Sequence, residues 1–313
     1  MHRFGFLVRR ALQIVPLLAV VLFVVAALVR VVPGDPARAL LGLGATPARA
    51  ARLDQELGVD KPLLSGYVDY ASHAIQGNLG NSVKAQEPVT TLIGERVGVT
   101  AWLLFFALLF ALLLALPLAI LSARRRDRPL DHGIRGVSVL ALSIPTFWLG
   151  LMLVSYVALP TGWFPVAGFG EGLAQHLHSI VLPALALALA IAPIQIRALR
   201  VALIRALNSD FVAAARAMGL NERRVLLRHA LPNAMVSSLT LLAAQLGALL
   251  FGEVVVESAF ALPGLGQAMV QAVSERDYAV VQGITLLAAL LVILVNLAVD
   301  VLYALLDPRV QVR

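Results

Sequence analysis

Residues 97–121 read VGVTAWLLFFALLFALLLALPLAIL, a run of 25 residues without a charged side chain. An α-helix needs about 20 mostly apolar residues to cross the hydrocarbon core of a bilayer, because it rises 1.5 Å per residue. Five other stretches are also mostly apolar, and they cover residues 11–29, 134–159, 180–199, 234–256 and 280–305. The sequence therefore predicts an all-α integral membrane protein with six transmembrane helices.

The composition agrees with a membrane protein. Apolar residues make up 60% of the chain and charged residues 14%, whereas soluble domains have about 45–50% and about 25%. The chain has no cysteine, which excludes disulfides, thiol catalysis and Cys-ligated zinc.

The positions of the basic residues orient the predicted spans. If both termini are cytoplasmic, 17 of the 25 Lys and Arg residues lie inside. Because cytoplasmic loops carry an excess of Lys and Arg, we expect both termini in the cytoplasm. The net charge of +7 then reflects topology, and nucleic-acid binding is not expected.

The N-terminal apolar run could be a signal peptide, because Arg9 and Arg10 precede it. The run has 19 residues, which is long for the apolar part of a signal. It ends in Arg30 rather than in a small-residue cleavage site. These features favour a retained helix.

The segment of some 65 residues between the first two spans is longer than a simple connection needs. Thr46 before Pro47, like Asp35 before Pro36, places an N-cap residue before a proline at the first helical position. Gly58 would end the second of these helices. We expect a small helical cap outside the membrane, and a division of the chain into residues 1–97 and a core of residues 98–313 that contains the other five spans and the long cytoplasmic loop.

Residues 200–233 form the long loop that is expected on the cytoplasmic side. Asn208 or Ser209 can cap a first helix, and Gly219 can end it in the left-handed conformation. Asn221 can then cap a second short helix, which Pro232 would stop. The sequence therefore predicts two short helices that meet at a corner.

The first of these helices would carry an apolar stripe at helical spacing, formed by Phe211, Ala214, Ala215 and Met218. Small alanines in such a stripe suit close contact with another protein. The same stripe would equally suit packing beneath the protein's own bundle, and spacing alone does not separate these two interpretations.

The residues of this loop resemble a known signature. DFVAAARAMG at 210–219, followed by HALPN at 229–233, is similar to the signature loop of binding-protein-dependent ABC importer permeases, in their dipeptide, oligopeptide and nickel branch. Ala213 stands where many of these permeases have an acidic residue. Further similarities to this branch lie at PGDPA (33–37), LGVDKP (57–62) with Tyr67 and Tyr70, GNLG (77–80) with Ser82, Glu257, Phe260, PGLG (263–266), RDY (276–278) and QG (282–283), although Ala279 replaces the usual proline.

The resemblance implies a permease subunit that imports short peptides or similar small solutes by alternating access. It implies a multi-pass protein in the cytoplasmic membrane of a prokaryote, with three kinds of protein partner in addition to lipid. These are two cytoplasmic ABC ATPases, which hold ATP and Mg, a second related permease, and an extracytoplasmic solute-binding protein. An importer of nickel or another non-peptide solute is the alternative within the same family, and glutathione is among the possible peptide-like solutes.

The resemblance also assigns roles to particular residues. We expect Ala214, Ala215 and Gly219 to allow close approach of an ATPase, and Arg216 to pair with a nearby carboxylate. The complete expected coupling set is Phe211, Ala214, Ala215, Arg216, Met218, Gly219, His229, Leu231 and Pro232. The binding protein is expected to dock on Pro263, Gly264, Arg276, Asp277 and Tyr278.

Polar residues inside two spans are candidates for the translocation path, because ionisable groups at membrane depth are commonly functional. These residues are Gln245, Glu253 and Glu257 on the fifth span, and Asn296 and Asp300 on the sixth. Hydrogen bonding between helices is the alternative role for both sets. His176 and His178 are expected to be solvated in an outer loop, so no metal site is predicted.

Other function classes receive less support from the sequence. The chain has no glycine-rich phosphate loop ending in Gly-Lys-Ser or Gly-Lys-Thr, since Lys61 and Lys84 are its only lysines and follow Asp60 and Val83. We therefore expect no ATPase site and no enzyme activity on this chain. A membrane-embedded hydrolase would need a nucleophile with a base, and an ATP-independent channel or carrier would have no use for the signature loop.

Overall fold

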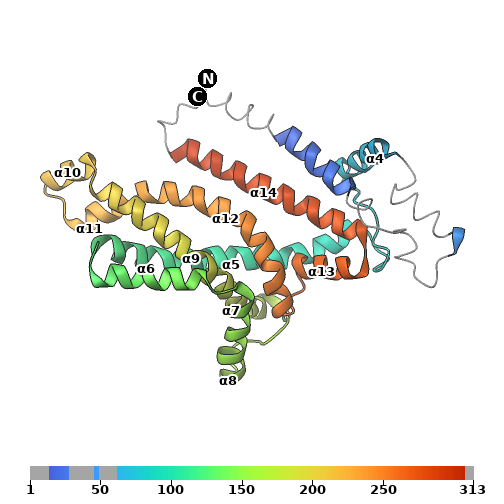
Figure 1. Ribbon diagram of the computed structural model, residues 1–313, viewed down its shortest axis with the longest axis horizontal. Coiled ribbons are helices and arrows are strands. Elements are labelled where there is room, and N and C mark those ends of the chain that lie inside the picture. The colour runs from blue at the N-terminus through green and yellow to red at the C-terminus, as the bar shows by residue number, and fades with distance from the viewer. Residues whose placement is uncertain (1–13, 28–45, 49–61, 307–313) are drawn as a thin grey trace. The chain divides into compact units, whose positions relative to one another are not determined.

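We analysed a computed structural model, which describes residues 14–27, 46–48 and 62–306 (Figure 1). Within these residues, helices make up the regular structure, apart from an isolated bridge between Asn81 and Pro88. The predicted all-α class is therefore confirmed.

Three helices are long and apolar enough to cross a membrane: α5 (Val89–Arg124), α9 (Gly172–Leu207) and α14 (Tyr278–Leu306). They cover the expected second, fourth and sixth spans. A fourth crossing is possible if the bent pair that begins with α6 (Pro129–Leu142) forms one span.

The two remaining expected spans also coincide with helices. The 29-residue α12 (Leu231–Ala259) covers the fifth, and the shorter apolar helix Ile14–Ala27 covers the described part of the first. The total of six spans remains a prediction.

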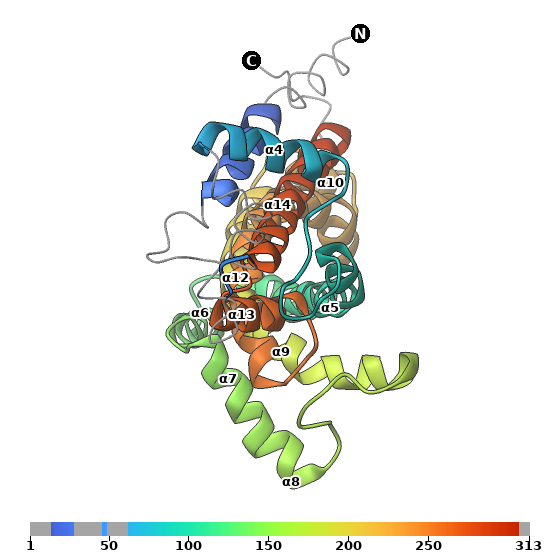
Figure 2. The same cartoon turned by 90° about the vertical axis from the view of Figure 1, so that its right-hand side faces the viewer.

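The third span differs from the expected single helix over residues 134–159. The helix α6 stops at Leu142 and α7 (Thr146–Leu153) continues at an angle of 98° (Figure 2). Pro145 explains the break, since it lacks an N–H and disfavours the helical conformation of Ile144 before it. After α7 the chain passes through a π-helix, Val154–Ala158, and α8 (Leu159–Thr161).

The chain folds into two compact units. The first contains residues 1–100 and 263–297, and the second contains residues 101–262 and 298–311. In the first unit, the beginning of α5 packs against α13 (Leu265–Glu275) and α14 through an apolar cluster that includes Val89 and Ile284. A Cβ at Gly283 would lie 2.5 Å from Cγ1 of Val89, so only glycine allows this approach.

The second unit is built around α9, which is the most buried of the three long apolar helices. It continues through Pro183 and Pro193, both buried, because neighbouring helices surround it. The helix α5 presents fully buried alanines at every fourth position, namely Ala107, Ala111, Ala115 and Ala119. Such small residues let neighbouring backbones approach closely.

The described part of the expected cap contains helices, and residues 76–88 form turns and irregular chain. Residues 47 and 48 are helical directly after Thr46, as predicted. The helix α4 (Leu63–Ile75) follows Pro62. The predicted helix start at Asp35 and Pro36 and the predicted end at Gly58 lie outside the described residues.

Candidate functional site

The loop between α9 and α12 forms the predicted corner. The helix α10 (Asp210–Ala217) begins after Ser209, and Gly219 adopts a φ of +78°. The N–H of Leu220 donates to the carbonyl of Ala215 at 3.2 Å, and the N–H of Gly219 donates to that of Arg216 at 2.9 Å. This pair of bonds closes the helix in a Schellman motif, for which glycine is the favoured residue.

The second short helix begins as expected but ends differently. The side chain of Asn221 accepts a hydrogen bond from the N–H of Arg224 at 2.8 Å and so caps α11 (Glu222–Arg224). A π-helix, Val225–Ala230, then leads directly into α12. The predicted stop at Pro232 is therefore wrong: this proline lies in the first turn of α12, where a missing N–H is tolerated.

The apolar stripe of α10 is divided between two environments. Ala215 is buried in the loop's own small core, together with Val212 and Val225. Phe211, Ala214 and Met218 are exposed, Met218 to 73%. The expectation that Ala215 contacts a partner is corrected, because its side chain faces inward; the other three remain available.

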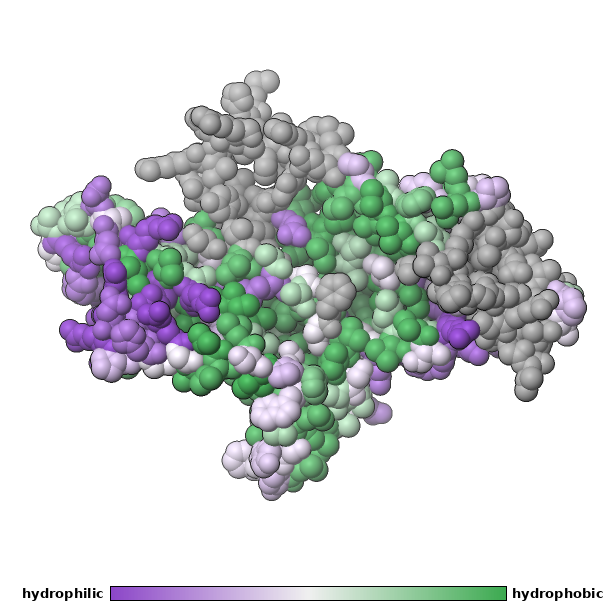
Figure 3. Space-filling view, in the orientation of Figure 1, coloured by the Kyte–Doolittle hydropathy of each residue, from purple (hydrophilic) through white to green (hydrophobic). Residues whose placement is uncertain are grey.

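Arg216 lies across the corner and holds its two helices together. Its guanidinium donates to both carboxylate oxygens of Glu222, at 2.7 and 3.2 Å, and to the carbonyl of Leu207 at 3.3 Å. The hydrogen bond from Arg216 lowers the pKa of Glu222. The predicted partner carboxylate thus belongs to the loop itself. In Figure 3 the hydrophilic residues gather over this end, where α10 and α11 lie.

The last three residues of the expected coupling set lie where the loop joins α12. His229 is half-buried and its carbonyl accepts from the side chain of Asn233 at 2.8 Å. Leu231 packs against the core of the second unit, and Pro232 is exposed.

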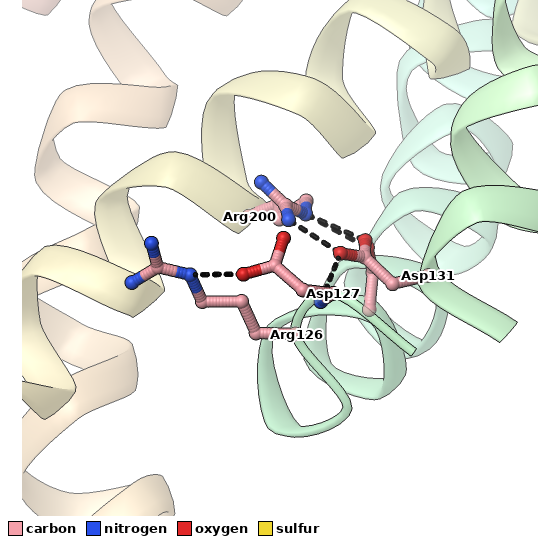
Figure 4. A network of polar contacts seen from close by, with 5 residues as sticks. Arg126, Asp127, Asp131 and Arg200 are labelled. Atoms are coloured by element: carbon pink, nitrogen blue, oxygen red, sulfur yellow. Dashed lines mark hydrogen bonds and ion pairs between the residues drawn. The ribbon is translucent and has the colours of Figure 1, made fainter. Parts of the chain in front are cut away.

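A buried polar network, which the sequence analysis missed, anchors the end of α9 (Figure 4). Arg200 donates to both oxygens of Asp131, at 2.7 and 2.5 Å, and to Oγ of Ser122 at 3.1 Å. The hydroxyl of Ser122 and the N–H of Asp127 also donate to Asp131. The sequence does contain one signal for this network: Asp131 lies in the first helical turn after Pro129, just beyond a cluster of arginines.

Polar side chains also lie between α9 and α12, which run side by side (Figure 1). The hydroxyl of Ser238 donates to Oε1 of Gln195 at 2.7 Å. Farther along α12, both polar atoms of Gln245 and Oε2 of Glu253 are buried, and no hydrogen-bond partner for them lies in the described part of the chain. Glu257 is fully buried nearby on the same helix.

The expected residues of the sixth span are less informative. Asn296 is exposed, and its side chain donates to the carbonyl of Val292 one turn earlier at 2.8 Å. The side chain of Asp300 lies outside the described residues. The ring of His176 stacks on that of Phe169, and the ring of His178 lies at a tilt against that of Phe164.

The segment expected to dock the binding protein is partly buried. Asp277 is 2% exposed; its Oδ2 accepts from the hydroxyl of Ser82 at 2.6 Å and the N–H of Lys84 at 3.2 Å. Tyr278 is also buried. Their expected role as surface contacts is therefore corrected, because these side chains pack inside the first unit. Pro263 and Arg276 are exposed, whereas Gly264 is buried at the start of α13.

Beside this segment the first unit has a hollow of about 440 Å³. Lys84, Arg96, Glu87 and Glu275 line it, together with Asp277. The second oxygen of Asp277, Oδ1, is buried and has no partner among the described residues. The hollow thus has a lining of mixed charge, and the unpartnered oxygen of Asp277 is buried beside it.

Comparisons with known proteins cover nearly the whole chain. Residues 115–312 match the family "Binding-protein-dependent transport system inner membrane component", and residues 1–104 match "Binding-prot-dependent transport system membrane comp, N-term". The glutathione transport system permease protein GsiC of Escherichia coli K12 is 36% identical over 309 residues, 99% of each chain. A putative peptide transport system permease protein of Brucella abortus is 35% identical over 308 residues, 97% of this chain and 98% of that protein.

A solved structure supports the fold. The MetNI methionine ABC transporter, in an inward-facing conformation, matches 69% of this chain and 96% of the solved chain, with a TM-score of 0.59 and 20% identity. The apolar helices and the family matches together identify a multi-pass inner membrane protein. The chain therefore belongs to the family of inner membrane components of binding-protein-dependent transport systems, which are the permease subunits of ABC importers.

Proposed function

We propose that this permease imports short peptides, and that two separate ABC ATPases drive it by seating against the corner at Gly219. The corner carries the proposal. Its Schellman motif, its apolar core and the pair between Arg216 and Glu222 make it a rigid projection, while Phe211 and Met218 leave apolar surface for a partner. A rigid projection can transmit the closure of an ATPase to the bundle.

The substrate class is supported by the relatives and by the chemistry of α12. The named relatives are a glutathione permease and a putative peptide permease. Glu253 and Gln245 offer buried polar atoms without partners among the described residues, which suits a path for a solute that carries amide and ammonium groups. Glu257 extends this candidate path, with Asn296 and Asp300 as weaker members. Nickel or another non-peptide solute is the alternative cargo.

The remaining partners follow from the proposed role. Six spans from one chain would line one side of a path, so a second related permease would complete it. With both termini in the cytoplasm, a solute-binding protein would dock outside on Pro263 and Arg276.

ATP and Mg would bind at the partner ATPases, since this sequence has no phosphate loop of its own. The chain itself is proposed to hold no cofactor and to catalyse no reaction.

The corner can be tested with Gly219→Val in the assembled transporter. At a φ of +78° a β-branched residue is strained, by roughly 1–2 kcal/mol, and the projection should be displaced. We expect ATP-driven uptake of a labelled dipeptide into vesicles to be lost while membrane insertion is unchanged. Gly136→Val is the matched control, because a Cβ there meets no atom within 4 Å and its φ is ordinary. Normal uptake by Gly219→Val would contradict the coupling role.

A further inference from the structure

The second unit has a basic hollow beside the Asp131 network. It measures about 520 Å³ and lies between α6, α9 and the turn that joins α5 to α6. Four arginines line it, and Asp127 is its one acidic lining residue; the arginines are Arg126, Arg135, Arg197 and Arg200.

Two of the four guanidinium groups are neutralised within the protein. Arg200 is paired with Asp131 at 2.5 Å, and Arg126 with Asp127 at 3.0 Å (Figure 4). Arg135 and Arg197 have no carboxylate or other polar partner in the part of the chain that the structure describes. The hollow therefore retains two unpaired positive charges from two different helices.

The rest of the lining is apolar except for Ser138, whose hydroxyl donates to the carbonyl of Ile134. Val139 on α6 and Ile196, Val201 and Ile204 on α9 share the hollow with the arginines. Next to them, Leu140 on α6 is 68% exposed. Arg135 lies midway along α6, where the third expected span begins, one turn before Val139. This combination of basic and apolar surface at a membrane edge matches the two parts of a phospholipid, and basic pockets between transmembrane helices are known to take anionic head groups.

We infer that this hollow binds an anionic phospholipid, whose phosphate lies between Arg135 and Arg197 and whose acyl chains follow α6 past Val139. The remaining positive charge disfavours a zwitterionic lipid, because its ammonium group would approach the same two guanidiniums. A bound phosphate would link α6 to α9 next to the pair between Arg200 and Asp131. The inference concerns lipid alone and does not depend on the transported solute.

The test uses the full chain purified in detergent, with phosphatidylglycerol, phosphatidylcholine or inorganic phosphate added. Native mass spectrometry counts retained lipid, and thermal unfolding measures protection. We expect the protein to retain phosphatidylglycerol and to be protected by it against thermal unfolding. Phosphatidylcholine and inorganic phosphate should do neither. The double variant Arg135→Gln with Arg197→Gln should bind it about thirtyfold more weakly, as expected for the loss of two basic contacts. Arg205→Gln with Arg223→Gln removes the same charge from exposed residues outside the hollow and should bind like the wild type.

Three outcomes would overturn the inference. Equal retention of phosphatidylcholine would show that charge does not select the lipid. Equal protection by inorganic phosphate would assign the hollow to a free anion. Equal weakening by both double variants would mean that overall charge, and not this hollow, holds the lipid. If the Arg135 variant fails to fold, Arg197→Gln alone should still weaken binding, since Arg197 is exposed on the surface of α9.

Discussion

Asp131 and Glu253 are both buried carboxyl groups of the second unit, but their surroundings differ. Both oxygens of Asp131 are occupied, by Arg200, Ser122 and the backbone of Asp127. Oε2 of Glu253 is buried and has no partner in the described part of the chain. A buried polar group without a partner costs stability. The bonds of Asp131 therefore stabilise the fold, whereas the unpartnered oxygen of Glu253 agrees with its proposed place on the translocation path.

The largest effect on stability is expected at Asp131, because both of its oxygens have hydrogen-bond partners. Asp131→Asn leaves the guanidinium of Arg200, whose side chain is 13% exposed, without its countercharge. Removing one partner of a buried pair costs about 3–5 kcal/mol. Unfolding of the purified protein in detergent should show this loss.

The matched control for Asp131 is Asp127→Asn, which breaks the exposed pair with Arg126. The side chains of that pair are 57% and 63% exposed, and exposed pairs contribute about 0–1 kcal/mol. If the two variants lost similar stability, the network around Asp131 would not be the anchor described above.

A substitution at Glu253 should have the opposite pattern, with little effect on stability and a large effect on uptake. Glu253→Gln keeps the volume but removes a carboxylate that no described group requires, so the free energy of unfolding should change by less than about 1 kcal/mol. Uptake of a labelled dipeptide should fall about tenfold or more, because the amide of glutamine cannot ionise to meet the ammonium group of a peptide, and a hydrogen bond to a charged group contributes about 1.5–3 kcal/mol. Glu171→Gln, at an exposed position, is the charge-matched control. A strongly destabilised Glu253→Gln protein with normal uptake would identify a structural role.

The smallest effect is expected at the exposed pair between Arg216 and Glu222. Arg216 lowers the pKa of Glu222 from its ordinary value of 4.5. A lowered pKa in the folded state stabilises the protein above the ordinary value, and this contribution is lost as the pH falls through the folded-state pKa. The thermal midpoints of the wild type and Glu222→Gln should therefore differ slightly at neutral pH and converge below about pH 4. A difference that persisted at lower pH would have another origin.

The corner at Gly219 and the network around Asp131 show which features local sequence predicts and which it does not. Gly219 and Asn221 could be assigned from sequence because capping depends on neighbours within about six residues. The location of Pro232 in the first turn of α12 could not be assigned from sequence, because the π-helix before it depends on how the loop packs on the bundle. The network was missed because Ser122, Asp131 and Arg200 come from three helices that only the fold brings together.

The sequence by itself determined the all-α class, most span positions and the ends of the loop helices, because hydrophobic length and capping are local properties. Only the tertiary structure decided which polar groups are satisfied. Asp131 and Glu253 are both acidic residues beside or within apolar runs, and each has a second acidic residue four positions away. Local sequence therefore does not separate them. Burial makes hydrogen bonding obligatory, and whether partners exist depends on helices that lie tens of residues away: α9 brings Arg200 to Asp131, whereas no described residue donates to Oε2 of Glu253.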